Sequence, residues 1–242
     1  MATIKQCLIL AAGNGSRLKA VSAGLPKPLV AFQGRPILEH ILRRAQRAGI
    51  EEFVIVLGYR GELIRQWFEN RWRDRARFTW VENPDYHKSN GVSALKARTA
   101  LRDNFLLLMA DHLFETETAR TMVRQYLAPG EVILGVDSNI HRVFDIDDAT
   151  KVRRRGDRIV DIGKEIEEYD AIDTGMFLCT PALFHDLDRS SKDGNCSLSD
   201  GMRLLASDSR LRALEIGDAP WYDLDTPEAL AHADEESLLY AA

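Results

Sequence analysis

The chain has 242 residues, of which 45% are hydrophobic and 29% charged, and this composition excludes a disordered acidic tail or linker. The net charge of −5 argues against nucleic acid as the main partner. The charge is uneven, because residues 213–242 hold eight acidic residues and no basic ones, which leaves +3 on residues 1–212. A solvated acidic helix is the simpler explanation, and the alternative is an anion-binding body with a cation-binding end.

Three widely spaced cysteines without a CxxC pair favour neither a disulfide scaffold nor a zinc site. The longest stretch without Asp, Glu, Lys or Arg covers residues 174–185 and is twelve residues long. A membrane-spanning helix needs about 20 apolar residues, so we expect no membrane insertion. The N-terminus also lacks the apolar core of a signal peptide. We therefore expect a cytoplasmic protein.

Apolar runs of strand length alternate with helical patterns along the first half of the chain. Strands are predicted over residues 4–10, 53–57, 77–81 and 105–109. Helices are predicted between Pro36 and Gly49, over 62–72 with Leu63, Ile64, Trp67 and Phe68 on one side, and over 92–101. This alternation is typical of a mostly parallel sheet with helices on both faces.

The pattern becomes less regular after about residue 140. Residues 150–155 and 158–162 flank Gly156-Asp157 and are predicted to form a hairpin. A further strand is expected over 172–179, and helices over 197–205 and 227–239. Because no linker or internal repeat divides the chain, we expect one α/β domain over residues 1–242, with a mixed, mostly parallel sheet.

A loop of small residues, glycines and an arginine follows the first predicted strand. Gly13 and Gly15 let the backbone turn sharply and bring its N–H groups to an anion, and Arg17 adds positive charge. A dinucleotide fingerprint would need a third glycine where Leu18 stands, and a Walker A motif is absent. The loop suits a polyphosphate, with an ordinary strand-to-loop turn as the alternative.

A lysine follows that loop on a restricted stretch of backbone. Lys27 stands between Pro26 and Pro28, which limit the conformations of the chain on both sides of it. Most surface lysines are solvated and mobile, whereas a lysine held in this way is placed to neutralise phosphate charge.

The sequence LAAGNGSRL followed by PKPL resembles the signature of nucleotidyltransferases that activate phosphorylated sugars and alcohols, in which the loop wraps the triphosphate of an NTP. The resemblance covers nearly the whole chain and is nearest to inositol-1-phosphate cytidylyltransferase domains. The segments that carry it are 83–95, 109–112, 145–152, 162–164, 170–175 and 221–228. It implies a Rossmann-like nucleotidyltransferase fold, with an NTP-binding half over about 1–112 and an acceptor-binding half over about 113–242.

The resemblance also implies roles for individual residues, with Arg17, Lys27 and Lys164 as the catalytic cations. The implied nucleotide-binding residues are Leu10, Ala11, Ala12, Gly13, Asn14, Gly15, Ser16, Arg17, Lys27, Glu82, Ser89, Asn90, Gly91, Ser93 and Asp111. The implied acceptor-binding residues are His112, Asp145, Lys151, Lys164, Asp173, Thr174 and Gly175. Lys164 ranks above Lys151, because arginines make the whole hairpin basic. A helix N-cap at Asn90 or Gly91 is compatible with contact to a base.

Three aspartates are candidates for holding Mg²⁺. Asp111 follows a buried strand and opens onto the crevice in which α/β sheets bind ligands. Asp223 and Asp225 are two residues apart, so on an extended segment they point to the same side. Mg²⁺ prefers oxygen ligands. By family position Asp111 and Asp225 are the expected ligands and Asp223 a possible one, with a strand-end or helix-capping aspartate as the alternative for Asp223.

The resemblance implies that a phosphate oxygen of the acceptor attacks the α-phosphorus of CTP and releases pyrophosphate. Inositol 1-phosphate is the expected acceptor. A sugar 1-phosphate, phosphocholine or a phosphonate is the alternative, and a nucleotide-binding regulatory module is the non-enzymatic one. Related cytidylyltransferase domains are fused to a membrane phosphatidyltransferase, so such a partner would act downstream in trans. The acceptor, the strictness for CTP and the oligomeric state do not follow from the sequence.

Overall fold

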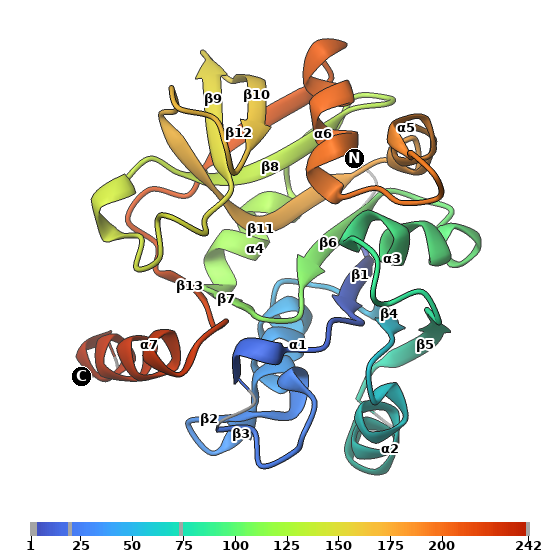
Figure 1. The fold of residues 1–242 in the computed structure, drawn as a ribbon, viewed down its shortest axis with the longest axis vertical. Coiled ribbons are helices and arrows are strands. Elements are labelled where there is room, and N and C mark those ends of the chain that lie inside the picture. The colour runs from blue at the N-terminus through green and yellow to red at the C-terminus, as the bar shows by residue number, and fades with distance from the viewer. Residues whose placement is uncertain (1–3, 19–20, 73–74, 241–242) are drawn as a thin grey trace.

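The computed structural model describes residues 4–18, 21–72 and 75–240. A nine-stranded mixed sheet runs through both halves of the chain in the order β5-β4-β1-β6-β11-β8-β12-β10-β9 (Figure 1). Its strands are β1 Gln6–Ala11, β4 Glu52–Leu57, β5 Arg77–Glu82, β6 Phe105–Met109, β8 Val132–Asp137, β9 Lys151–Arg155, β10 Arg158–Gly163, β11 Ala171–Cys179 and β12 Leu211–Glu215. Within this sheet β10 and β11 run opposite to the other strands, so it is mixed and mostly parallel as predicted.

Two short ribbons lie outside the main sheet. β7 (His112–Phe114) pairs antiparallel with β13 (Trp221–Asp223), and β2 (Ala31–Phe32) pairs with β3 (Arg35–Pro36). The first ribbon sets Asp223 directly opposite His112. It thereby joins the acidic end of the chain to the carboxyl end of β6.

Helices cover both faces of the sheet, as the alternating pattern predicts. They are α1 Ile37–Arg47, α2 Gly61–Trp72, α3 Asn90–Lys96, α4 Thr116–Val123, α5 Leu183–Ser190, α6 Leu198–Ser207 and α7 Pro227–Tyr240, with 3₁₀ turns at Ser16–Leu18, Lys27–Leu29, Arg98–Ala100 and Ile140–Arg142. α1, α2 and α4 pack in one apolar cluster, and α3, α5 and α6 pack in the other. α7 extends away from the sheet (Figure 1).

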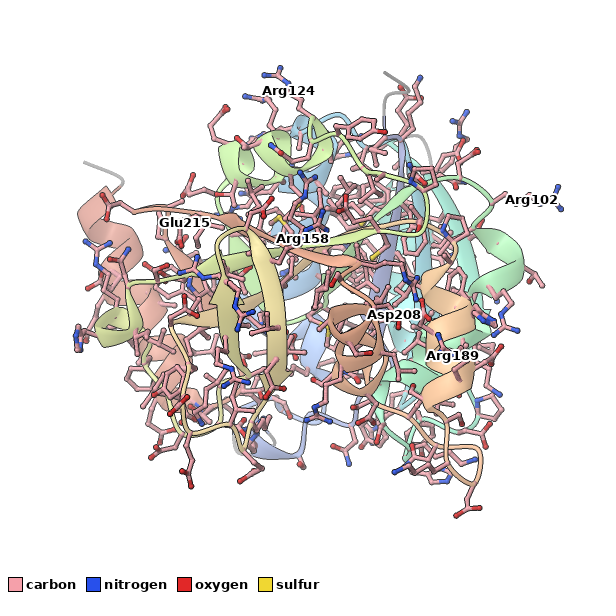
Figure 2. All side chains as sticks on the ribbon, turned by 90° about the horizontal axis from the view of Figure 1, so that it is seen from above. Arg102, Arg124, Arg158, Arg189, Asp208 and Glu215 are labelled. Carbon is pink, nitrogen blue, oxygen red and sulfur yellow. The ribbon has the colours of Figure 1, made fainter. Side chains whose placement is uncertain are left out.

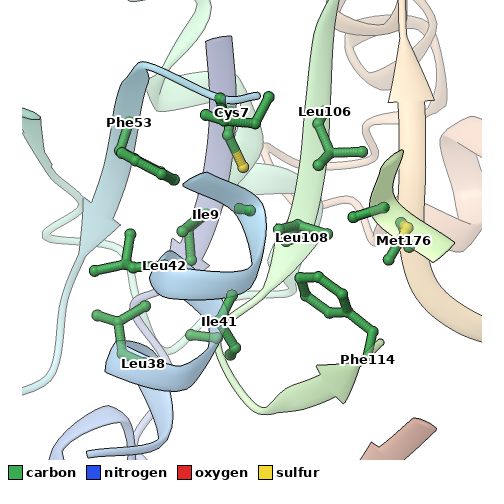
Figure 3. Packing of buried hydrophobic residues seen from close by; sticks show 14 of the residues in the cluster. Cys7, Ile9, Leu38, Ile41, Leu42, Phe53, Leu106, Leu108, Phe114 and Met176 are labelled. Atoms are coloured by element: carbon green, nitrogen blue, oxygen red, sulfur yellow. The ribbon is translucent and has the colours of Figure 1, made fainter. Parts of the chain in front are cut away.

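β1 illustrates why two cores form. Successive side chains of a strand point to opposite faces, so Cys7 and Ile9 lie in one cluster while Leu8 and Leu10 lie in the other. Figure 3 shows the first cluster, in which residues of α1 such as Leu42 pack beside Ile9 and Phe53. Burial of this apolar surface is the main force that holds helices and sheet together.

Charged side chains cover the outside of the molecule. Figure 2 shows Arg102 and Arg124 extending from its edges, and Arg189 beside Asp208, to which it is ion-paired at 3.4 Å. No helix in the described part of the chain is long and apolar enough to cross a membrane.

The structure corrects several predicted details. The helix expected over 92–101 starts at Asn90 and ends at Lys96, before a separate 3₁₀ turn. In α2 the buried residues include Ile64, Phe68 and Trp72, at a spacing of four, whereas Leu63 is 40% exposed. The elements β2, β3, β7, α4, β8, α5, β12 and β13 were not predicted.

Candidate active site

The glycine-rich loop lies at the carboxyl end of β1 and lines a cavity of about 270 Å³. Gly15 has φ +55°, and a Cβ there would lie 2.6 Å from the Cβ of Lys27. Only glycine therefore lets the side chain of Lys27 lie against the loop. The predicted residues that line this cavity are Leu10, Ala11, Gly13, Asn14, Gly15, Ser16, Arg17, Lys27, Asp111 and Asp225. Ala12 is buried instead, and its carbonyl accepts a hydrogen bond from the N–H of Tyr59 at 3.0 Å.

Lys27 is the buried cation of this cavity. Pro26 leads into the 3₁₀ turn Lys27–Leu29, and the lysine side chain is only 7% exposed. Its Nζ donates to Asp111 Oδ2 at 2.7 Å and also to Asp225 Oδ1. Burial opposes the charged ammonium, but the carboxylates outweigh it and raise the pKa of Lys27. The prolines therefore hold a charged lysine between two carboxylates.

Ion pairs continue from Lys27 to the second half of the chain. Asp225 also accepts from Arg17, Arg17 pairs with Asp148, and Asp148 pairs with Lys164. The result is an alternating line of charges that crosses the site. In order, it runs Asp111, Lys27, Asp225, Arg17, Asp148 and Lys164. The three predicted catalytic cations thus lie in one network.

His112 extends this network at the Asp111 end. Its Nδ1 lies 2.9 Å from Asp111 Oδ1, its Nε2 lies 3.9 Å from Asp223 Oδ2, and its ring stacks on Trp221. Burial opposes the imidazolium, but the two carboxylates raise the pKa of His112 to about 9. Gly175, at φ +74°, leaves room for the ring, because a Cβ there would lie 2.5 Å from its Cδ2.

The residues around Asp111 fit a divalent cation. One donor atom each from Asp111, His112 and Asp223 lies within 4.8 Å of the others. Oδ1 of Asp223 is buried without a hydrogen-bond partner in the described structure, and burial raises the pKa of this carboxyl to about 6. Carboxylate oxygens are the ligands that Mg²⁺ prefers. This group contains Asp223 rather than the expected Asp225, whose carboxylate is held by Lys27 and Arg17.

A second, larger cavity of about 780 Å³ lies beside the first and is lined from both halves of the chain. Its polar lining includes Arg17, Asn90, Asp111, His112, Asp137, Asp145, Asp148, Lys164, Asp173, Asp223 and Asp225. Asp173 accepts from the N–H of Gly175 at 2.7 Å, and burial raises its pKa to about 6. The hydroxyl of Thr174 is used inside the fold, because it donates to the carbonyl of Gly135 at 2.8 Å.

Most of the predicted nucleotide-binding residues in the segment 83–95 pack inside the fold and do not line either cavity. Ser93 is buried and accepts from Asn83 at 2.9 Å, and a Cβ on Gly91 would lie 2.7 Å from the carbonyl oxygen of Cys196. Asn90 lines the large cavity, and its Oδ1 accepts from the N–H of Leu198 at 2.8 Å. The cap of α3 is Ser89, so the expected N-cap at Asn90 or Gly91 is wrong.

Two further predicted residues lie outside both cavities. Glu82 ends β5 with its side chain exposed. Lys151 donates to the carbonyls of Lys164 and Asp147 at 2.9 and 3.4 Å, so it braces the chain beside Lys164. The ranking of Lys164 above Lys151 agrees with this placement.

Sequence reasoning missed two contributors to the site. Asp148 pairs with two of the cations, although the sequence placed it only within the segment 145–152 that carries the resemblance and gave it no role. Trp221, two residues before Asp223, donates its indole N–H to Asp137 at 2.8 Å, which fixes the ring that stacks on His112. Both contacts depend on loops or ribbons that place distant segments together.

Comparison with known proteins identifies the family. The model of the MobA-like NTP transferase domain matches residues 7–215. The chain belongs to the MobA-like NTP transferase family. This confirms the resemblance to nucleotidyltransferases inferred from the glycine loop and Lys27.

Curated relatives of this NTP transferase are longer proteins. The bifunctional IPC transferase and DIPP synthase of Rubrobacter xylanophilus is 37% identical over 237 residues, which cover 97% of this chain and 52% of that protein. The protein of the same name from Thermococcus kodakarensis is 31% identical over 231 residues, with 95% and 50% covered. The chain therefore spans about half the length of these relatives.

Among solved structures, the inositol-1-phosphate CTP transferase from T. maritima matches this NTP transferase with a TM-score of 0.86 at 24% identity. The match covers 97% of this chain and 95% of that one. It confirms the predicted nucleotidyltransferase fold.

Proposed function

We propose that this protein transfers a cytidylyl group from CTP to a phosphorylated polyol, inositol 1-phosphate, and releases pyrophosphate. The observation that carries the proposal is that Arg17, Asp111 and Asp225 line both cavities. A triphosphate on the loop and an acceptor phosphate in the large cavity would therefore meet at one set of cations and carboxylates. Two polyanions approach each other only where their charge is neutralised, and such a set of groups provides this.

Each cation has a defined task in this reaction. The N–H groups of the loop, with Arg17 and Lys27, hold and orient the triphosphate, and Lys164 holds the acceptor phosphate. The nucleophilic phosphate is already ionised near neutral pH, so no general base is needed. Asp111, with Asp223 and Asp225 beside it, would hold Mg²⁺, which when bound neutralises charge on the phosphates.

The acceptor is inferred from the relatives and from the lining of the large cavity. The names of the relatives refer to IPC transferase, and the solved neighbour is an inositol-1-phosphate CTP transferase. Asp173 and His112 offer an acceptor and a donor for ring hydroxyls. A sugar 1-phosphate, phosphocholine or a phosphonate remains the second acceptor class. The product would suit a membrane phosphatidyltransferase acting downstream.

A panel of nucleoside triphosphates and acceptors, with pyrophosphate release as the readout, tests this proposal. We expect turnover with CTP, inositol 1-phosphate and Mg²⁺, and a loss of about 100-fold in Asp225→Asn. Asp234→Asn, which removes an exposed acid from α7, is the matched control and keeps wild-type turnover. Turnover only with UTP or dTTP and a sugar 1-phosphate would overturn the assignment, and nucleotide binding without any turnover would favour a regulatory module.

A further inference from the structure

One wall of the large cavity is a segment with little burial, defined here as the wall segment (residues 140–148). It leaves β8 and returns to β9 on the side of the molecule where β13 lies (Figure 1). None of its residues is buried. Phe144 stacks on His232 of α7 at 4.8 Å between ring centroids, and Arg142 pairs with Asp218 at 3.3 Å in an exposed ion pair. Segments with so few buried contacts open at low free-energy cost.

Asp148 is the point at which the wall segment meets the catalytic cations. One carboxylate oxygen contacts Arg17 of the glycine loop, and the other contacts Lys164 at the end of β10. The side chain of Asp148 is 36% exposed, so solvent and solutes reach it. Burial opposes its charge, but Lys164 and Arg17 lower the pKa of the carboxyl. The carboxylate therefore stands between two cations in the way that a phosphate oxygen pair would.

Binding of phosphates has different consequences for the three carboxylates of the ion-pair line. Asp111 belongs to the group that fits a divalent cation, so an ion can replace Lys27 as its positive partner. Asp225 pairs with Lys27 as well as with Arg17, so it keeps one partner when a phosphate takes Arg17. Asp148 is not in the group of residues close enough to share that ion. A phosphate that binds Arg17 or Lys164 must therefore displace the carboxylate of Asp148. No other cation among the described residues then pairs with this carboxylate.

We propose that Asp148 is an internal competitor of the substrate phosphates: it occupies Arg17 and Lys164 in the ligand-free protein and lowers affinity for phosphate ligands. The proposal rests on the assignment of these two cations to phosphates under the proposed function. Displacement of Asp148 also removes an ion-paired anchor of the wall segment. Asp148 thus limits how tightly nucleotide and pyrophosphate bind.

Calorimetric titration with inorganic pyrophosphate and with CTP, each in the presence of Mg²⁺, tests this directly. Asp148→Asn keeps the shape of the side chain and removes its charge, so we expect the Kd of pyrophosphate to fall about 3- to 10-fold, given the modest strength of exposed ion pairs. Asp148→Glu restores the carboxylate and should return the Kd toward the wild-type value. Glu165→Gln is the matched control, because it removes a negative charge beside Lys164 without an ion pair in the described structure.

Each outcome decides one point. A lower Kd in Asp148→Asn, with Asp148→Glu and Glu165→Gln near wild type, supports the competitor role. An unchanged or higher Kd in a folded Asp148→Asn overturns it. An equal fall of the Kd in Glu165→Gln also overturns it, because the effect would then come from the net charge near the site and not from the ion pairs of Asp148. If the wild-type protein binds neither CTP nor pyrophosphate, the proposed function itself fails.

Discussion

Lys27→Met isolates what the buried ammonium contributes, because methionine preserves much of the side-chain length and removes the charge. Lys27 is 7% exposed, and its partners Asp111 and Asp225 are 24% and 23% exposed. Removal of one partner from a buried pair costs about 3–5 kcal/mol. Since water still reaches the carboxylates, we take the lower end, about 3 kcal/mol. For a chain of this length that lowers Tm by about 6–12 °C.

Thermal unfolding followed by circular dichroism, in EDTA and in MgCl₂, measures this loss. Lys96→Met is the matched control, because Lys96 pairs with Asp85 at 2.9 Å with both side chains about one-third exposed. An exposed pair of this kind contributes about 0.2–1 kcal/mol. We expect MgCl₂ to raise the Tm of Lys27→Met more than that of the wild type, since the unpaired carboxylates then bind the ion in the folded state. Equal losses in both variants would refute the reasoning.

Two further substitutions test other supports of the site. Gly175→Ala should cost about 1–3 kcal/mol and raise KM for the acceptor more than for CTP, because the new Cβ strains a backbone at φ +74° and displaces the ring of His112. Gly130→Ala is the matched control, because Gly130 has φ +79° but no neighbour that a Cβ would displace. It therefore measures the backbone strain without the clash with His112. Equal KM values for the acceptor in both variants would contradict the role of the His112 ring. Ser197→Ala removes the hydroxyl of the capping box of α6 and should cost about 1 kcal/mol. Burial raises the pKa of Asp200, but hydrogen bonds from the backbone and hydroxyl of Ser197 outweigh it, so the pKa lies below its usual value of 3.8. The stability that the contact between Ser197 and Asp200 contributes is therefore present above pH 3.8 and is lost as the pH falls further. The difference in Tm between wild type and Ser197→Ala should therefore shrink in strong acid, and a constant difference would count against the link.

Elements with a long or strongly periodic pattern were predictable from sequence. The helix between Pro36 and Gly49 has its apolar residues on one side, and the structure confirms it as Ile37–Arg47. The strand at the start of the chain alternates between two cores, so its near-continuous apolar run is explained by burial on both faces. Lys27 was predictable because prolines restrict the backbone at the residue itself.

Features that depend on contacts between distant segments were not predictable. β7 and β13 are three residues each, too short for a periodic signal, yet their pairing sets His112 opposite Asp223. Lys151 and Lys164 both stand on a basic hairpin, and only the fold shows that one braces the other. Nothing in the sequence indicates that the carboxylate of Asp225, the ligand expected from family position, also contacts Lys27 and Arg17.

The uneven charge of the chain acquires a physical meaning in this site. The acidic end supplies Asp223 and Asp225, and the basic body supplies Arg17 and Lys27, so each cation already has a carboxylate partner. A triphosphate alone would take the cations and leave the carboxylates unmatched, while a metal ion alone would leave the cations unmatched. A nucleotide that arrives with its metal carries both charges and replaces both sets of partners together. Under the proposed function, the acidic end would therefore favour the metal-bound nucleotide over a free anion, whereas a wholly basic pocket would bind both.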